Sequence, residues 1–66
     1  MRIVFIDYNT QAPVLDVHES DYKTIPRKGE PIFIGGHPKQ LVKYVRWYYI
    51  GDGLTGVLER VEVILE

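Results

Sequence analysis

The segment from Val42 to Ile50 restricts the fold of this chain more than any other segment. Seven of its nine residues are β-branched or aromatic. Such side chains lose rotamer freedom in a helix but pack well on a pleated strand. The whole chain shows the same bias, because valine, isoleucine, threonine and aromatic residues make up 26 of its 66 residues while alanine occurs once. The composition therefore predicts a β-rich protein.

The periodicity of this segment leaves two structures open. Apolar and aromatic residues recur at helical spacing from Leu41 to Tyr48, so a helix over residues 38–50 is the alternative. As a strand, the segment alternates except at one point, where a β-bulge at Lys43–Tyr44 restores the pattern. The bulge is expected to place Val42, Val45, Trp47 and Tyr49 on one face, where the first three serve the core, and Arg46, Tyr48 and Ile50 on the opposite face.

Four other segments have the composition and alternation of strands. They are Arg2–Asp7, Val14–Val17, Ile32–Ile34 and Val57–Leu65. In the last segment, alternation places Val57, Val61, Val63 and Leu65 on one side and Leu58, Arg60, Glu62 and Ile64 on the other, with Glu59 breaking the apolar side. Glycine-rich stretches at residues 35–38 and 51–56 read as turns, and residues 18–28 as a polar loop.

The length of the chain indicates a single domain over residues 1–66. A domain of this size buries only about 60% of the surface that its unfolded chain exposes. The hydrophobic fraction of 45% is sufficient for a small core. Self-association would bury further surface, so a homodimer is one expected state.

A family resemblance supports the strand over the helix. The run from Ile25 to Ile34 contains Pro26-Arg27-Lys28-Gly29-Glu30, and Val42, Val45 and Trp47 follow it, before a final alternating strand. This order resembles small bacterial and phage proteins with Src-homology-3-like barrels, in which a Pro-x-x-Gly-Glu turn precedes a Val-x-x-Val-x-Trp strand. The resemblance implies an all-β fold, either a five-stranded Src-homology-3-like barrel or a strongly bent antiparallel sheet. It extends over residues 25–65 and matches no catalytic or ligand motif.

Charge is unevenly distributed along the chain although the net charge is only −1. Residues 1–22 carry a balance of −3, residues 23–46 a balance of +5, and residues 47–66 a balance of −3. Sheets favour opposite charges on neighbouring strands, so the three blocks are expected to neutralise one another. The alternative is an exposed basic face.

The sequence gives little support for an enzyme, a metal site or a cofactor. It has one serine and two histidines, and no pattern that activates a nucleophile. The cluster His18-Glu19-Ser20-Asp21 reads as a solvated loop, because metal ligands normally come from separated elements. The glycines of residues 51–56 lack the Gly-Lys-Ser/Thr ending of a phosphate-binding loop. We therefore expect a non-enzymatic protein without metal or cofactor.

The expected location is the cytoplasm, without membrane association. The chain has no cysteine, so disulfides and zinc–thiolate sites are excluded. Its first apolar run, Ile3 to Ile6, is too short for a targeting segment or a membrane span.

Two functions follow from these observations. The first is a protein-binding module, such as an accessory or inhibitor protein of a phage or mobile element, whose partner is another protein or a second copy of the chain. The alternative is a barrel that binds single-stranded RNA or DNA through cations and stacking aromatics. Both hypotheses assign partner binding to the same five residues, which are Lys39, Lys43, Tyr44, Arg46 and Tyr48.

Overall fold

A computed structural model describes residues 2–18 and 25–66. Within these residues the fold is all-β, with strands β1 (Arg2–Asp7), β2 (Pro13–His18), β3 (Pro31–Ile32), β4 (Gln40–Gly51) and β5 (Gly56–Leu65). The predicted all-β class is confirmed, and the segment that also fitted a helix lies in β4. Most of the predicted polar loop and of the His18–Asp21 cluster falls at residues 19–24, outside the described part of the chain.

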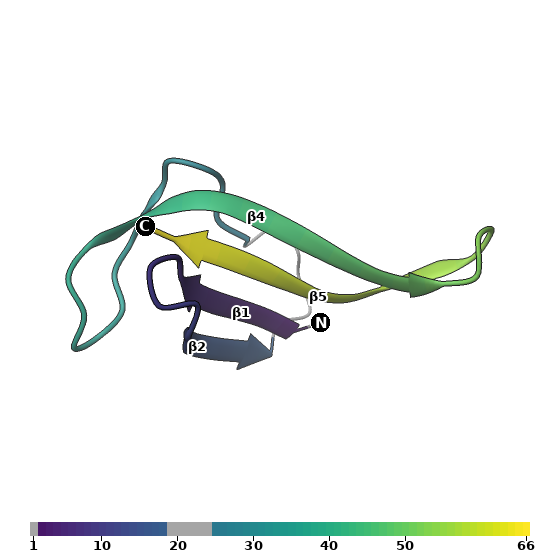
Figure 1. Cartoon of the computed structure of the whole chain (residues 1–66), viewed down its shortest axis with the longest axis horizontal. Coiled ribbons are helices and arrows are strands. Elements are labelled where there is room, and N and C mark those ends of the chain that lie inside the picture. Colours follow the sequence, from purple (N-terminus) through teal and green to yellow (C-terminus); the bar gives the residue numbers. More distant parts are fainter. Residues whose placement is uncertain (1, 19–24) are drawn as a thin grey trace.

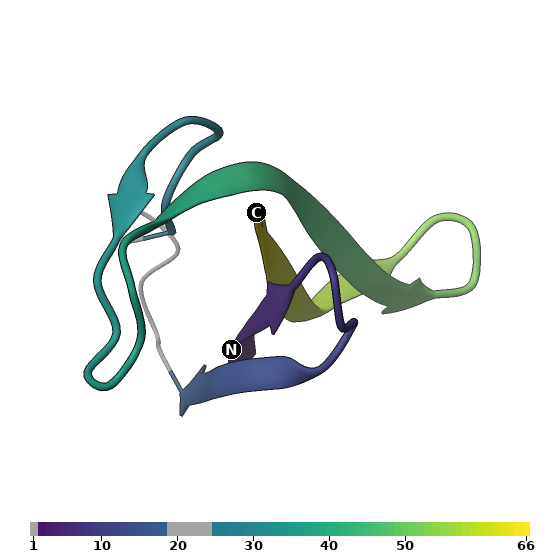
Figure 2. The ribbon, with the colours of Figure 1, turned by 60° about the vertical axis from the view of Figure 1, so that its left-hand side comes forward.

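The five strands form one curled sheet in the order β2-β1-β5-β4-β3. The strand β4 arches over one side and β2 lies along the other, so the sheet takes the shape of a half-barrel (Figure 2). Three strand pairs are antiparallel, but β1 and β5 run parallel. The sequence did not predict this parallel pair. Through it β1, and with it β2, becomes part of the sheet.

The strand β5 lies at the centre of the sheet, between β1 and β4 (Figure 1). Its last residues, Val63, Ile64 and Leu65, are consecutive and fully buried. A continuous apolar run of this kind is typical of a strand that is covered on both faces. The predicted alternation therefore holds only for the middle of β5, whereas its end contributes to two cores.

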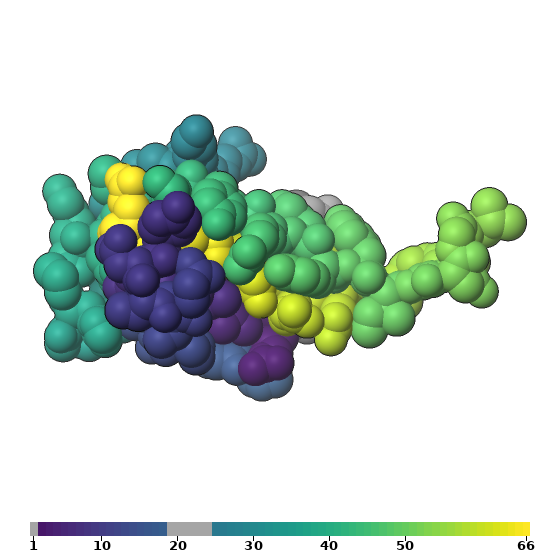
Figure 3. Space-filling view, viewed as in Figure 1, coloured from purple at the N-terminus to yellow at the C-terminus, as the bar shows by residue number. Residues whose placement is uncertain are grey.

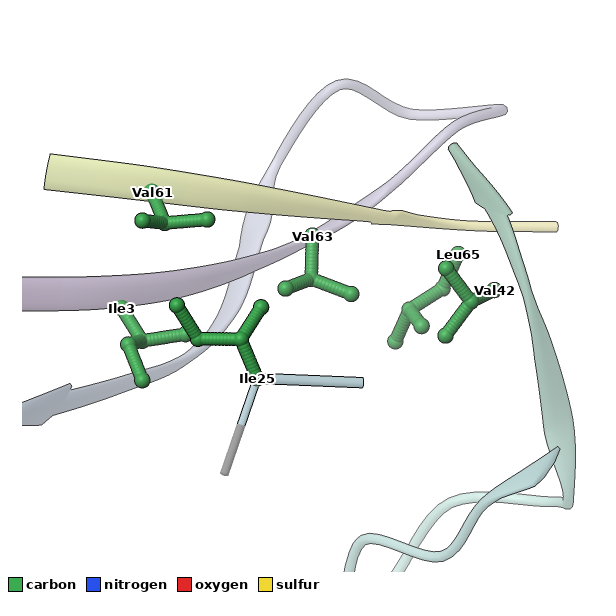
Figure 4. Packing of buried hydrophobic residues seen from close by; sticks show 6 residues of the cluster. All are labelled: Ile3, Ile25, Val42, Val61, Val63 and Leu65. Carbon is green, nitrogen blue, oxygen red and sulfur yellow. The ribbon is translucent and has the colours of Figure 1, made fainter. Parts of the chain in front are cut away.

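The larger core fills the inner face of the half-barrel. Val61, Val63 and Leu65 from β5 contact Ile3 from β1 and Val42 from β4 (Figure 4). Ile25, which precedes β3, closes this cluster from the open side. A smaller cluster on the outer face contains Val4, Ile6 and Ile64, with Tyr44 packed against it.

Two bulges set which side chains of the β4–β5 hairpin face the core. The predicted bulge at Lys43–Tyr44 is confirmed, because the register shifts between Val42 and Tyr44. A second shift lies at Glu59, since Tyr48 pairs with Arg60 and Tyr49 with Leu58. Simple alternation had placed Val57 with the buried residues and Leu58 with the exposed ones. The bulge at Glu59 reverses both assignments, so Leu58 packs against the core and Val57 is 72% exposed.

The turns use glycine where the backbone requires it. Arg27 and Glu30 close a tight turn through a 3.1 Å backbone hydrogen bond, and Gly29 has a φ of 89°, as a type II turn demands at that position. The backbone N–H of Gly29 donates to Val42 in β4, which fixes the turn against the sheet. The third strand is shorter than the predicted Ile32–Ile34, because Ile34 already accepts the hydrogen bond of the next turn from His37.

The Glu59 bulge predicts opposite outcomes for two valines of the same strand. Val61→Ala should lower the free energy of unfolding by about 1 to 3 kcal/mol, because it removes buried methyl groups and leaves a cavity. Val57→Ala should change it by less than about 0.5 kcal/mol, as expected for an exposed position. Chemical denaturation of both variants checks this, and equal losses would contradict the bulge.

Candidate protein-binding surface

Three of the five predicted site residues lie on the outer face of β4 and are largely occupied by contacts within the protein. Tyr44, Arg46 and Tyr48 are half-buried there, beside Arg60 and Glu62 of β5, and we call these five residues the tyrosine–arginine face. Lys43 is also half-buried and lies 4.5 Å from the ring centroid of Tyr8. Lys39 is exposed in the connection before β4, apart from this face.

Glu62 bridges the two arginines of the tyrosine–arginine face, and Arg60 has a second carboxylate in Glu59, at 3.2 Å. Its two carboxylate oxygens accept hydrogen bonds from Arg46 Nη2 at 2.8 Å and from Arg60 Nε at 3.2 Å. Arg46 and Glu62 are direct cross-strand partners in the β4–β5 register. Arg46 of the basic middle block is thus paired with the acidic final block, as the charge pattern predicted, whereas the other described cations of that block form no ion pair within the described residues. A second exposed pair, Arg2 and Asp16, joins β1 to β2 at 2.6 Å.

The aromatic rings of this face are covered by the protein's own cations and by each other. The guanidinium carbon of Arg60 lies 4.0 Å from the ring centroid of Tyr48, and that of Arg46 lies 5.8 Å from the centroid of Tyr44. Tyr8 meets Tyr44 edge to face, with 6.5 Å between centroids. These are favourable cation–π and aromatic geometries. Stacking of a nucleic-acid base on Tyr48 would have to displace Arg60.

The pKa of Glu62 reflects this network. Burial raises the pKa of its carboxyl, but the hydrogen bond from Arg60 and the charges of both arginines more than offset burial, so the pKa lies below its ordinary value of 4.5. The pKa of Asp16 is also lowered, chiefly by its hydrogen bond from Arg2. Both carboxylates are therefore held in their charged form.

The opposite, inner side of β4 leaves apolar groups uncovered. Trp47 was expected in the core with Val42 and Val45, but it is 45% exposed, whereas Val42 is buried. Trp47 pairs with the fully buried Val61, but its own side chain does not join the core cluster. Within the described residues β1 pairs with β5 only as far back as Arg60, opposite Tyr48, and beyond this point the β4–β5 hairpin leaves the body of the protein.

The end of this hairpin is an arm of nine consecutive exposed residues, from Tyr49 to Val57 (Figure 3). Its large apolar side chains are almost bare, with exposed fractions of 67% for Tyr49, 60% for Ile50, 72% for Val57 and 101% for Leu54. Tyr49 lies on the inner face and Ile50 on the outer face, so both sides of the arm are apolar. Asp52 is the only charged residue of the nine.

The tip of the arm is built as a tight four-residue connection between Gly51 and Gly56. A Cβ on Gly51 would clash with the backbone carbonyl of Thr55, so only glycine fits there. Gly53 has a φ of 102°, and the Thr55 hydroxyl donates to Asp52 Oδ1 at 2.9 Å. The glycine-rich stretch at residues 51–56 was expected to form a turn, and strand pairing continues up to Gly51 and Gly56.

A pocket of about 470 Å³ lies at the base of the arm. Its walls combine β4 with the segment before β3, and we call it the Trp47 pocket; it is lined by Ile25, Pro26, Arg27, Lys28, Tyr44, Val45 and Trp47. Sequence reasoning missed this pocket because residues 25–28 read as a turn. Exposed apolar positions often mark binding surfaces. Applied to the sequence, this rule would identify the arm only if the bulge at Glu59 were known, because without the bulge Val57 is assigned to the buried face.

The described residues hold no group of three or more histidine, cysteine, aspartate or glutamate side chains placed to bind a metal. In the same part of the chain, no helix is long and apolar enough to cross a membrane. Comparison with protein-family models, with curated proteins and with solved structures found no match. The assignment of the candidate binding surface therefore depends on the geometry of the described residues alone.

The Glu62 network predicts a specific response to acid. Because the folded-state pKa of Glu62 is lowered, its contribution to stability is complete above the ordinary pKa and is lost as the pH falls through the folded pKa. Glu62→Gln should lower the free energy of unfolding at neutral pH by about 1 to 3 kcal/mol, since it leaves Arg46 without a carboxylate and Arg60 with Glu59 alone. The difference from wild type should shrink below a pH of about 4.5.

Urea denaturation across the range from acid to neutral pH measures this response. The matched control is Glu66→Gln at the exposed end of the chain, which should match wild type at neutral pH. A Glu62→Gln variant as stable as wild type at neutral pH would show that the network contributes nothing.

Proposed function

We propose that the protein is a non-enzymatic protein-binding module that engages its partner through the arm of residues 49–57. The observation that carries this proposal is the arm itself, which projects from the body with apolar side chains on both faces. A solvated hairpin of this length would be expected to carry charges, because isolated apolar side chains in water gain nothing from exposure. A partner that covers the arm would remove this apolar surface from water.

The chemistry of the arm and its base is that of a protein interface. Tyrosine and tryptophan give large contact areas at low entropic cost, and they are enriched at the centres of interfaces. Tyr49 and Trp47 lie on the same face, and the Trp47 pocket beside them offers a recess for a side chain. Arg27 at the pocket adds a residue type that interfaces also favour.

Nucleic acid is the less favoured partner because the expected basic face is internally neutralised. Arg46 and Arg60 share the carboxylate of Glu62, and Arg60 covers the ring of Tyr48. Phosphate binding depends on cations that can replace counterions, and base stacking depends on open ring faces. Of the five residues first assigned to partner binding, Lys39 alone is fully exposed.

In this proposal the module acts by occupying a surface of its partner. An accessory or inhibitor protein of a phage or mobile element is one such role. Such proteins need no catalytic residues, since binding alone blocks or adapts the target. The proposal leaves the tyrosine–arginine face with a structural role, in which it holds β4 against β5 and so positions the arm.

Substitutions in the arm should abolish binding without affecting the fold. A Leu54→Ser, Val57→Ser variant is expected to bind its partner roughly tenfold more weakly or worse, because interface centres concentrate binding energy in a few apolar residues. The partner is captured from nuclease-treated extract with the tagged protein, and its affinity for purified variants is measured by calorimetry. The control is Leu15→Ser on β2, which removes an exposed leucine away from the arm.

A different result would remove the arm from the interface. If the arm variant and the Leu15→Ser control bound the captured partner with the affinity of wild type, the arm would not be the binding surface.

Single-stranded oligonucleotides should not bind at physiological salt. Fluorescence anisotropy with a labelled oligonucleotide checks this across salt concentrations, using a Lys43→Glu, Arg46→Glu variant for comparison. Binding that weakens steeply with salt and disappears in the variant would favour the nucleic-acid function instead.

A further inference from the structure

The arm and the Trp47 pocket are complementary to each other, although one hairpin carries both. We propose that the tip of each arm occupies the Trp47 pocket of a second copy of the chain, so that two copies form a reciprocal, two-fold dimer. This inference rests on the proposed function, because it names the protein partner of the arm. The contacts would place Leu54 against the apolar walls of the pocket and Asp52 beside its cations.

The pocket offers an apolar wall with a basic rim. Val45, Trp47 and Ile25 supply the wall, and Arg27 and Lys28 supply the rim. No carboxylate side chain lines the pocket among the residues that the structure describes. Within the same residues, neither rim cation forms an ion pair. The rim therefore presents positive charge to an incoming group.

The turn that carries the rim is held in place. The backbone N–H of Arg27 donates to the carboxylate of Glu30, and the backbone N–H of Glu30 donates to the Arg27 carbonyl at 3.1 Å. Gly29 and Glu30 are joined to Val42 of β4 by backbone hydrogen bonds of 2.8 and 3.0 Å. A rim fixed in this way loses little conformational entropy when a partner binds.

The tip of the arm has the opposite character. Leu54 is fully exposed and Asp52 lies two residues before it, so the tip presents one large apolar side chain next to one carboxylate. The hydrogen bonds between Asp52 and Thr55 fix the turn that carries both side chains. An apolar group flanked by negative charge matches an apolar wall with a positive rim, which is the charge pattern that selects partners.

The spacing between the pocket and the tip of the arm allows two copies to bind each other symmetrically. Trp47 at the pocket is seven residues from Leu54 at the tip, a distance of roughly 20 Å along an extended strand. Two arms that lie antiparallel bring each tip to the other's pocket if the two-fold axis passes near Ile50. Residues close to such an axis meet their own copies, and residues 47–51 carry no charge that would repel.

The edges of the sheet favour the same arrangement. From Lys43 to Gly51 the outer edge of β4 has no backbone partner within the described residues. The other free edge, β2, begins at Pro13 and carries Asp16, both of which discourage strand pairing. An open edge accepts a strand from another chain. Antiparallel arms would place two β4 edges side by side.

A foreign acidic segment in the pocket would leave the arm uncovered, whereas a second copy covers the pocket and the arm together. A foreign partner that uses the arm would then have to displace the second copy, so binding would be coupled to dissociation of the dimer.

Charge-reversal variants test the dimer. Light scattering after size exclusion and sedimentation equilibrium should show a dimer for wild type. Asp52→Lys should weaken dimerisation by roughly tenfold or more, because it places like charges at the rim, and Arg27→Glu, Lys28→Glu should do the same. An equimolar mixture of these two variants should form heterodimers. In one pocket the introduced lysine then meets the two introduced glutamates, while the native charges face each other in the other pocket.

The controls are Glu66→Lys and Lys39→Glu, which reverse exposed charges outside the arm and pocket and should dimerise as wild type does. A wild-type protein that stays monomeric at all concentrations would overturn the dimer. A dimer that neither reversal weakens, or a mixture that does not re-associate, would place the interface elsewhere and would also overturn it. The proposed function is tested separately, since a monomer whose arm variant loses a foreign partner would retain that function.

Discussion

The burial of β5 on both faces is the constraint on which the rest of the structure depends. Val61, Val63 and Leu65 supply the inner core, and Ile64 supplies the outer cluster, so this one strand joins both halves of the hydrophobic interior. Its two neighbours are the first strand of the chain and the long β4. Because β5 requires partners on both sides, the first and last strands lie side by side, and the half-barrel follows from the twist of the resulting sheet.

The same constraint explains why the arm is exposed. Only the end of β5 lies beside β1, since their pairing begins at Arg2 and Arg60. Before Arg60, β5 has β4 as its sole neighbour within the described residues, and the Glu59 bulge marks this change. The hairpin therefore extends beyond the core, and its apolar side chains are exposed to solvent. An exposed apolar hairpin with tightly fixed glycines at its tip is better explained by a partner than by folding.

Local features of the sequence were predictable, and non-local ones were not. The bulge at Lys43–Tyr44 was found because it interrupts alternation within a single strand. The parallel pairing of β1 with β5 depends on residues about 60 positions apart, and no local pattern encodes it. Trp47 was expected in the core because its periodicity is that of Val45, but its side chain is half-exposed, one pair before β1 ends beside β5. Alternation placed Glu62 on the side of its strand away from Val61 and Val63, but only the cross-strand register shows that it bridges Arg46 and Arg60.

Amide hydrogen exchange at several protein concentrations tests the central claim most directly, namely that β5 holds the fold and that the arm it leaves uncovered is bound by a second copy of the chain, as proposed. The amides of Val61 to Leu65 should be strongly protected and independent of concentration, as expected for a core strand. Those of the arm, from Tyr49 to Val57, should gain protection as the concentration rises and the arms become covered. Arm amides that exchange at the same rate at every concentration, or a β5 that exchanges as fast as the arm, would contradict the account.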